Sequence, residues 1–384
     1  MSYAPLACAM TGNTWLRGSH VTTSSHRRRS RTRLLTTAVA AVAACISLAA
    51  NSAGIASAAP QQQLADYISD ASPTPARAET FLLNGESRWL IPTGNGPKQT
   101  TFPAAFAHSL SNPNVAPAGA NDWSCKPQAG RNPVVLVHGT WENAYSNWSM
   151  ISPALRQAGF CVYALDYGIQ PPSQGGGVAA AFPGVYGTGD IVKSANQIKT
   201  FVDKVLASTG AAKVSMVGHS MGGISTRQYL RFDGGAAKVA NVVTLGATNH
   251  GTTLNGIGAL GRTINDLGVD ILGPLALGVG VSGTQQISNS PFLKTLNSGG
   301  VYALGDIRYT VVGTRYDEVT TPYSSTFFPT GTKNTRNITL QDGCPQDTSD
   351  HFSMSYSPRA TSIVLRALGA DVPLVCAPNA WLVG

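Results

Sequence analysis

The feature that most constrains the fold is a five-residue turn, Gly-His-Ser-Met-Gly at 218–222, with Ser220 at its centre. The residues before it, 213–217, are mostly apolar and predict a buried strand, whereas residues 223–232 after it are compatible with a helix. The glycines let the backbone approach its neighbours closely while the serine takes a strained conformation. A strand that passes through such a turn directly into a helix predicts an α/β fold.

Strands and helices are predicted to alternate around this turn. Apolar runs predict strands at 133–137, 160–165, 239–245 and 309–312, and helices are predicted at 151–158 and 190–208. Continuous apolar runs are typical of parallel strands that are buried on both faces. Their alternation with helices predicts a mostly parallel sheet flanked by helices. Residues 122–384, about 260 in number, suit one such domain.

Two segments depart from this alternation. Residues 60–121 are rich in Pro, Ala and polar residues and show little periodicity, which predicts an N-terminal arm that packs on the domain or is partly loose. Residues 254–283 are rich in Gly, Leu, Ile and Val and carry almost no charge. They fit either a pair of core helices or a mobile apolar cap. Their position between two core strands, after the serine turn, favours the cap.

The first 59 residues have the layout of a secretory signal. Arginines between Arg27 and Arg33 precede an apolar stretch, 34–50, and small residues then lead to an Ala-Ser-Ala sequence at 56–58. No later run reaches the roughly 18 apolar residues that a membrane span needs. A lipoprotein site at Cys45 and a twin-arginine signal are the alternatives. We therefore expect a secreted protein with no integral membrane segment in the mature chain.

Loss of this leader would change the charge balance. The chain has 27 Lys and Arg and 19 Asp and Glu. Six arginines and no acidic residue precede Ala59, so 21 basic residues remain against 19 acidic ones, a net charge of +2. No basic patch is visible in what remains, and no nucleic-acid partner is expected. A single domain of this size is expected to be a monomer.

Four cysteines remain after the leader. An even number in an exported chain predicts two disulfides. Of the three possible pairings we favour the sequential one, Cys125–Cys161 and Cys344–Cys376, because each closes a local loop; four free thiols are the alternative. No spacing resembles a zinc site, and no calcium ligand set is legible. No cofactor is expected.

Ser220 is the candidate nucleophile, although an incidental serine in a glycine-rich turn is the alternative. A serine hydroxyl needs a base to take its proton, and in this type of fold the chain order is serine, acid, histidine. His351, in a polar loop before the last predicted helix, is the preferred base, and His250, just past a strand, is the alternative. Three further histidines lie before or beside the serine and are not preferred: His108, His138 and His219.

The candidate acid is Asp317, a few residues after the 309–312 strand. A carboxylate at a strand end can orient the imidazole and stabilise its protonated form. The competing carboxylates are Glu318, Asp342, Asp347 and Asp350. The last three are close to His351 in sequence, where a role in shaping the loop is favoured.

The tetrahedral intermediate of such a reaction needs backbone N–H donors, an oxyanion hole. One donor should be Met221, which follows the serine. The other should be Thr140, because His138 and Gly139 end the first predicted strand and the glycine lets the next amide turn inward. An ordinary turn at the strand end is the alternative.

Five stretches together carry a resemblance to a known family. They are Val-Val-Leu-Val-His-Gly-Thr at 134–140, Val-Gly-His-Ser-Met-Gly-Gly at 217–223, Leu-Gly-Ala-Thr-Asn-His-Gly-Thr at 245–252, Thr-Arg-Tyr-Asp-Glu-Val-Thr-Thr-Pro at 314–322, and Gln-Asp-Gly-Cys-Pro at 341–345 with Asp350 and His351. With these, residues 122–376 resemble the secreted bacterial class 2 lipases, a branch of the α/β-hydrolases.

The resemblance implies an α/β-hydrolase fold, a Ser220-Asp317-His351 triad, and an oxyanion hole at Thr140 and Met221. It also implies hydrolysis of acylglycerols and related fatty-acyl esters through an acyl-enzyme. Substrate would be lipid or ester, met in solution or at a lipid–water interface. A short-chain carboxylesterase, a polyesterase or an acyltransferase of the same fold is the alternative, and a non-catalytic binding protein is a further one.

Overall fold

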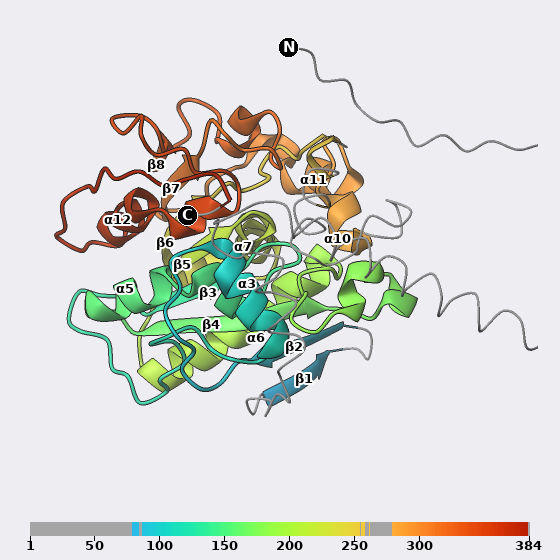
Figure 1. The fold of residues 1–384 in the computed structure, drawn as a ribbon, viewed down its shortest axis with the longest axis horizontal. Helices are drawn as coiled ribbons and strands as arrows, with labels where there is room; N and C mark the ends of the chain where they lie inside the picture. Colours follow the sequence, from blue (N-terminus) through green and yellow to red (C-terminus); the bar gives the residue numbers. More distant parts are fainter. Residues whose placement is uncertain (1–78, 84–86, 254, 258–260, 262–278, 383–384) are drawn as a thin grey trace, which may run out of the picture. The chain divides into compact units, whose positions relative to one another are not determined.

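An eight-stranded sheet organises the chain, in the order β1-β2-β4-β3-β5-β6-β7-β8 (Figure 1). The computed structural model describes residues 79–83, 87–253, 255–257, 261 and 279–382. The strands are β1 (Glu79–Leu83), β2 (Ser87–Ile91), β3 (Val134–Val137), β4 (Val162–Ile169), β5 (Val214–His219), β6 (Val239–Leu245), β7 (Arg308–Gly313) and β8 (Thr335–Thr339). Neighbouring strands from β4 to β8 run parallel, and β2 is antiparallel to both β1 and β4.

Helices cover both faces of this sheet. On one face lie α6 (Ile191–Thr209), α7 (Met221–Phe232) and α11 (Pro291–Leu296), and on the other lie α4 (Ala144–Trp148), α5 (Ile151–Gln157) and α12 (Pro358–Ala367). Two further helices of the described residues, α3 (Phe102–Ser111) and α10 (Gly280–Gln285), pack against other helices. The helix ends carry recognisable signals. Asp190 caps α6 by accepting a hydrogen bond from the backbone of Lys193, and Gly210 ends that helix with a φ of 71°.

The apolar run of β3 explains the two cores. Successive side chains of a strand point to opposite faces. Accordingly Val135 and Val137 lie in one core with residues of α6 and α7, and Val134 and Leu136 lie in the other core with residues of α5 and α12. All four valine and leucine side chains are fully buried. The prediction of parallel strands buried on both faces is confirmed for this central strand.

The N-terminal arm has more regular structure than its sequence suggested. Residues 60–121 contain β2, which extends the sheet, and α3, whose Phe102 ring lies 4.6 Å from the ring of Phe352. Pro103 is compatible with this helix because proline in the first turn lacks only an N–H that would have no helical partner. The arm therefore packs beside the loop that carries His351.

Two predicted segments lie wholly or mostly outside the described residues. The leader, 1–59, lies outside the described residues. So does most of the predicted cap at 254–283, apart from residues 255–257, 261 and 279–283. The end of that segment forms most of α10.

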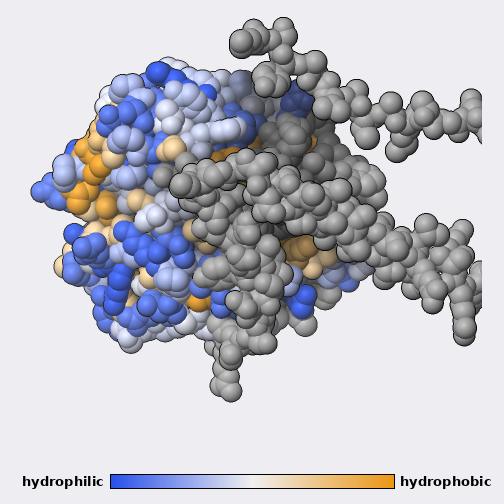
Figure 2. Space-filling view, viewed as in Figure 1, coloured by the Kyte–Doolittle hydropathy of each residue, from blue (hydrophilic) through white to orange (hydrophobic). Residues whose placement is uncertain are grey.

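Two disulfides join Cys125 to Cys161 and Cys344 to Cys376, which is the sequential pairing. Within the described ranges, no helix has the length and apolar character needed to cross a membrane. Where described residues are visible in Figure 2, the surface is largely hydrophilic, with a smaller apolar area on the side where α12 lies. Exposed Leu374 and Val375 follow that helix in sequence.

Candidate active site

Ser220 stands at the sharp junction between β5 and α7. Its φ of 52° and ψ of −125° are strained for a residue with a side chain. The backbone N–H of Ser220 donates to the carbonyl of Leu245, at the end of β6, over 2.8 Å. A Cβ on Gly222 would lie 2.1 Å from the carbonyl oxygen of Val137, so only glycine fits where α7 begins against β3. The turn thus has the geometry of a nucleophile elbow.

Asp317 and His351 meet beyond the end of β7. The Nδ1 atom of His351 lies 2.9 Å from Oδ1 and 3.0 Å from Oδ2 of Asp317, and both side chains are buried. The same Oδ1 accepts hydrogen bonds from the backbone N–H groups of Val319 and Thr320, over 3.1 and 2.6 Å. The carboxylate is therefore oriented by its own turn as well as by the imidazole.

The loop of His351 lies directly beside the elbow. The carbonyl oxygen of His351 is 2.8 Å from Nε2 of His219, the residue before Ser220. The Nε2 atom of His351 is buried and has no hydrogen-bond partner in the part of the chain that the structure describes. With Nδ1–H donated to Asp317, this second nitrogen is the one able to accept a proton. The chain therefore brings Ser220, Asp317 and His351 to one end of the sheet.

The two candidate oxyanion donors flank the elbow. Met221 is the first residue of α7, so its N–H has no acceptor within its own helix. No hydrogen bond of the Thr140 N–H occurs among the described residues. The Thr140 hydroxyl accepts from the side-chain amide of Gln286 over 2.8 Å.

Gln286 was not anticipated from the sequence. It follows α10, is buried, and also accepts from the hydroxyl of Thr248, just after β6, over 3.1 Å. It therefore links the Thr140 loop to the end of the sheet. The residue is 146 positions from Thr140, and no local pattern could have connected them.

The alternative base is engaged elsewhere. The Nε2 of His250 lies 3.0 Å from the carbonyl oxygen of Phe327, and its Nδ1 lies 3.2 Å from the hydroxyl of Tyr302.

His138 is fully buried, and burial lowers its pKa to about 4. Its Nδ1 lies 2.8 Å from the carbonyl oxygen of Gly139, so its imidazole contacts the backbone directly after β3.

The competing carboxylates occupy different surroundings. Asp342 forms an exposed ion pair with Arg315 over 2.7 Å. Asp347 accepts hydrogen bonds from the backbone of Ser349 and the hydroxyl of Ser357, so it shapes the loop before His351.

Glu318 and Asp350 are both bonded to the backbone of the loop that carries His351. Oε2 of Glu318 accepts from the N–H of His351 over 3.3 Å, and Asp350 accepts from the backbone of Ser353. Burial raises the pKa of both carboxyls, and for Glu318 the charges of Asp350 and Asp317 raise it further. In the described ranges, no group of three or more His, Cys, Asp or Glu side chains is placed to hold a metal ion.

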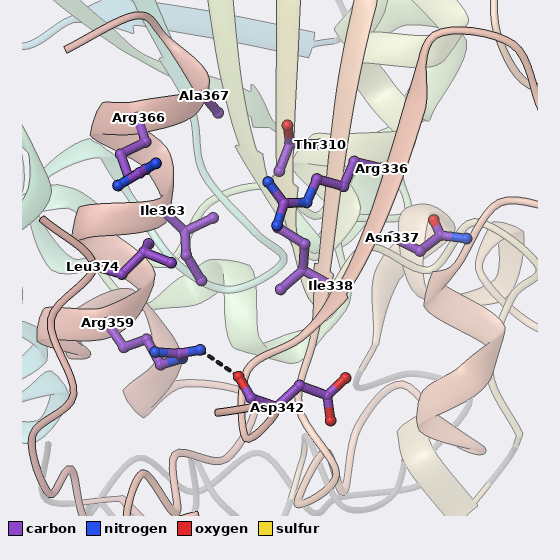
Figure 3. Close-up of a pocket in the computed structure, with 10 residues that line it drawn as sticks. All are labelled: Thr310, Arg336, Asn337, Ile338, Asp342, Arg359, Ile363, Arg366, Ala367 and Leu374. Atoms are coloured by element: carbon purple, nitrogen blue, oxygen red, sulfur yellow. Dashed lines mark hydrogen bonds between the residues drawn. The ribbon is translucent and has the colours of Figure 1, made fainter. Parts of the chain in front are cut away.

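A separate pocket of about 380 Å³ opens between α12 and β8. Figure 3 shows Arg359 and Arg366 on the α12 side and Arg336 on the β8 side, with Arg359 bonded to Asp342. None of the predicted catalytic or oxyanion residues lines it. The pocket is therefore distinct from the site around Ser220.

Comparison with known proteins gives a family match. A family model described as Lipase (class 2) matches residues 131–359. Triacylglycerol lipases from Pseudarthrobacter phenanthrenivorans and Burkholderia plantarii are each 32% identical over 130 residues, 32% of this chain and 35% and 31% of those proteins. The aligned part thus spans about a third of the length of these curated relatives.

The fold also has a solved counterpart. The crystal structure of Aspergillus fumigatus lipase B aligns with a TM-score of 0.50 and 21% identity, covering 68% of this chain and 56% of that one. At this identity the similarity concerns the fold alone. Together with the sheet order and its flanking helices, it confirms the predicted α/β-hydrolase fold.

Proposed function

This chain belongs to the class 2 lipase family, and from that premise we propose that it is a secreted serine hydrolase of fatty-acyl esters. Ser220 is its nucleophile, His351 its general base and Asp317 the acid that orients the base. Acylglycerols and related carboxylic esters are its substrates. The observation that carries the proposal is the contact between His351 Nδ1 and the Asp317 carboxylate. It leaves His351 Nε2 buried and without a hydrogen-bond partner among the described residues, in a ring that lies 4.9 Å from the ring of His219, the residue before Ser220.

The reaction follows from the roles of these groups. Nε2 of His351 takes the hydroxyl proton of Ser220 as Oγ attacks the ester carbonyl carbon. The resulting imidazolium is stabilised by Asp317 and then gives its proton to the departing alcohol oxygen. Water, deprotonated by the same histidine, attacks the acyl-serine ester and releases the carboxylic acid and the free serine.

The oxyanion is held by the backbone N–H groups of Thr140 and Met221. Removal of one such donor typically lowers the stability of the transition state by about 3 kcal/mol. Gln286 supports this role because its amide fixes the Thr140 side chain, and with it the loop that presents the N–H.

The substrate class rests on two supports. The relatives that match part of the chain are triacylglycerol lipases, and residues 254–283 are rich in Leu, Ile, Val and Gly. A cap of this composition, as predicted from the sequence, would bury an acyl chain, and each buried methylene contributes about 0.8 kcal/mol. Export is supported by the signal-like sequence of the leader and by the two disulfides, which persist in oxidising compartments.

The test is covalent labelling combined with a substrate series. A fluorophosphonate should label Ser220 in the folded protein, and Ser220→Ala should abolish both labelling and ester hydrolysis. Folded protein that resists the label would contradict the enzyme assignment. A series of p-nitrophenyl esters from acetate to palmitate should give kcat/KM values that rise with chain length; a maximum at acetate would favour a short-chain esterase.

A further inference from the structure

We propose that Glu142 and His219 form a buried ion pair that positions three segments of this site: the Thr140 loop, the Ser220 elbow and the His351 loop. This role rests on the function proposed above. Both are positioning residues, since neither contacts the reacting atoms. His219 ends β5 directly before Ser220, and Glu142 follows the Thr140 loop by two residues. Both side chains are essentially inaccessible to solvent, with exposed fractions of 0% and 1%.

His219 contacts two of the three segments by itself. Its Nδ1 lies 2.9 Å from Oε2 of Glu142, and its Nε2 lies 2.8 Å from the carbonyl oxygen of His351. A carbonyl oxygen only accepts, so Nε2 carries a proton. A carboxylate also only accepts, so an ionised Glu142 requires a second proton on Nδ1. The geometry thus fits an imidazolium between a carboxylate and the backbone of the base.

Glu142 extends the contact to the third segment. The same Oε2 accepts the backbone N–H of Gly139 over 2.9 Å, and Oδ1 of Asn147 accepts that N–H over 3.1 Å. Gly139 precedes Thr140, the candidate oxyanion donor. The bonds from Gly139 through Glu142 and His219 to His351 therefore connect the oxyanion loop, the elbow and the base in one continuous path.

The surrounding charges favour the protonated ring. Burial lowers the pKa of His219, but the charge and hydrogen bond of Glu142, the carbonyl of His351 and the charge of Asp317 outweigh it, so its pKa is raised overall. His138 lies near this pair, and its pKa is lowered first by burial and further by the charge of His219. Protonated His219, and with it the chain of hydrogen bonds from Gly139 to His351, is present at low pH. Both are lost as pH rises through the raised pKa of His219.

A neutral arrangement is the competing description. Nδ2 of Asn147 lies 3.1 Å from Nδ1 of His219, so an unprotonated Nδ1 could accept from it while a protonated Glu142 keeps its place. A buried ion pair is also weak grounds for stability, because desolvation offsets the attraction. The test must therefore separate the charge state of the pair from folding and from catalysis.

The charge state is read by NMR on folded Ser220→Ala, which lacks the nucleophile. The ring nitrogens of His219, assigned by comparison with His219→Asn, should both be protonated at pH 7, and deprotonation should require alkaline pH. An unprotonated Nδ1 at pH 7 would overturn the proposal. This measurement needs no activity, so it stands even if the proposed function fails.

The positioning role is read by kinetics of Glu142→Gln on p-nitrophenyl butyrate. We expect kcat to fall about 10- to 100-fold with KM within about 2-fold, as expected for small displacements of aligned groups. The decrease in kcat at alkaline pH, which we expect from deprotonation of His219, should also begin at lower pH. His250→Asn, at a partly buried histidine bonded away from the site, is the matched control and should keep the wild-type kcat.

The two proposals fail in different ways. Hydrolysis retained by Ser220→Ala would remove the proposed function. The ion-pair proposal alone would fail if Ser220→Ala loses hydrolysis while folded Glu142→Gln keeps the wild-type kcat and the wild-type pH profile at alkaline pH. If Glu142→Gln does not fold, His219→Asn carries the same kinetic test, because it retains a donor toward Glu142 and loses the bond to the His351 carbonyl.

Discussion

Nδ1 of His351 lies within 3.0 Å of both carboxylate oxygens of Asp317, and each side chain is only 1% exposed. The carboxylate does not depend on the histidine for its orientation. Its Oδ1 is already held by the N–H groups of Val319 and Thr320, in the turn that follows β7. This arrangement fixes one ring nitrogen as the donor and leaves the other as the base.

Replacing Asp317 with Asn should therefore disable the base without disturbing the fold. The amide can still accept from the turn, but it cannot stabilise an imidazolium and can reverse the tautomer of His351. In the Ser-His-Asp enzymes where it has been made, this change lowers kcat roughly 10⁴-fold. We expect a loss of about 10³- to 10⁴-fold in kcat for ester hydrolysis, measured together with the rate of fluorophosphonate labelling.

Asp342→Asn is the matched control. Asp342 is exposed and pairs with Arg315 on the surface, and exposed pairs contribute about 0–1 kcal/mol. Its kcat should equal that of the wild type. If Asp317→Asn keeps its activity and Asp342→Asn loses it, the acid of the triad is Asp342 and not Asp317.

The sequence predicted the elements whose signals are local. The 239–245 strand coincides with β6, and the 190–208 helix differs from α6 by one residue at each end. At its start the difference arises because Asp190 is the cap that precedes the helix. An apolar run and a capping residue act within a few positions of the chain. The prediction that Ser220, Asp317 and His351 belong together used chain order and motif, and the geometry brings them to one end of the sheet.

Elements that depend on their neighbours were not predicted. The sequence of β8, Thr-Arg-Asn-Ile-Thr, is mostly polar. It forms a strand because its backbone pairs with that of β7 at the edge of the sheet. The links between Glu142 and His219 and between Thr140 and Gln286 join residues 77 and 146 positions apart. A single sequence carries no local signal for such contacts, which arise from the order of the strands.

Gly139→Ala should damage the oxyanion loop selectively. A Cβ at this position would lie 2.3 Å from Oε2 of Glu142 and 3.1 Å from Cβ of Ser220, so the loop must shift. Displacing one oxyanion donor lowers kcat on the order of 10²- to 10³-fold. The measurement is kcat on a soluble ester, with thermal unfolding recorded in parallel.

Gly130→Ala provides the comparison. Its Cβ would meet no atom within 4 Å, although its φ of 77° is unfavourable for alanine. That conformation costs about 1–2 kcal/mol, so the melting temperature should fall while kcat is kept. A wild-type kcat in Gly139→Ala would show that the loop does not supply the donor.

The two disulfides should differ in their effect on activity although they close loops of similar size. They span 36 and 32 residues, so removing either should lower the free energy of unfolding by about 3–4 kcal/mol in the chain-entropy model. Cys376 lies three residues before Asn379, whose side-chain amide donates to Ser349 and Ser353 on either side of His351. Only loss of Cys344–Cys376 should loosen that loop.

The paired serine variants test this difference. Cys344→Ser/Cys376→Ser should lower kcat in folded protein, and Cys125→Ser/Cys161→Ser should not, with chemical denaturation giving both stabilities. Equal kcat in the two variants under folding conditions would mean that the C-terminal tail does not position His351.

Glu318→Gln should stabilise the protein at alkaline pH. Burial and the neighbouring Asp350 and Asp317 raise the pKa of Glu318 above its ordinary value of 4.5. The folded state therefore keeps a proton that the unfolded state releases, and stability falls as pH rises from about 4.5 toward the raised pKa. Glutamine stays neutral and can still accept from the N–H of His351. A pKa difference of one corresponds to about 1.4 kcal/mol, which partial exposure reduces.

We expect the free energy of unfolding of Glu318→Gln to exceed that of the wild type by about 1–2 kcal/mol at pH 9. At pH 4, where both states of the wild type are largely protonated, the difference should vanish. Asp306→Asn, at a side chain that is 96% exposed, should give no such pH dependence. A difference for Glu318→Gln that is the same at both pH values would mean that its effect comes from altered packing, and that Glu318 carries no buried charge at alkaline pH.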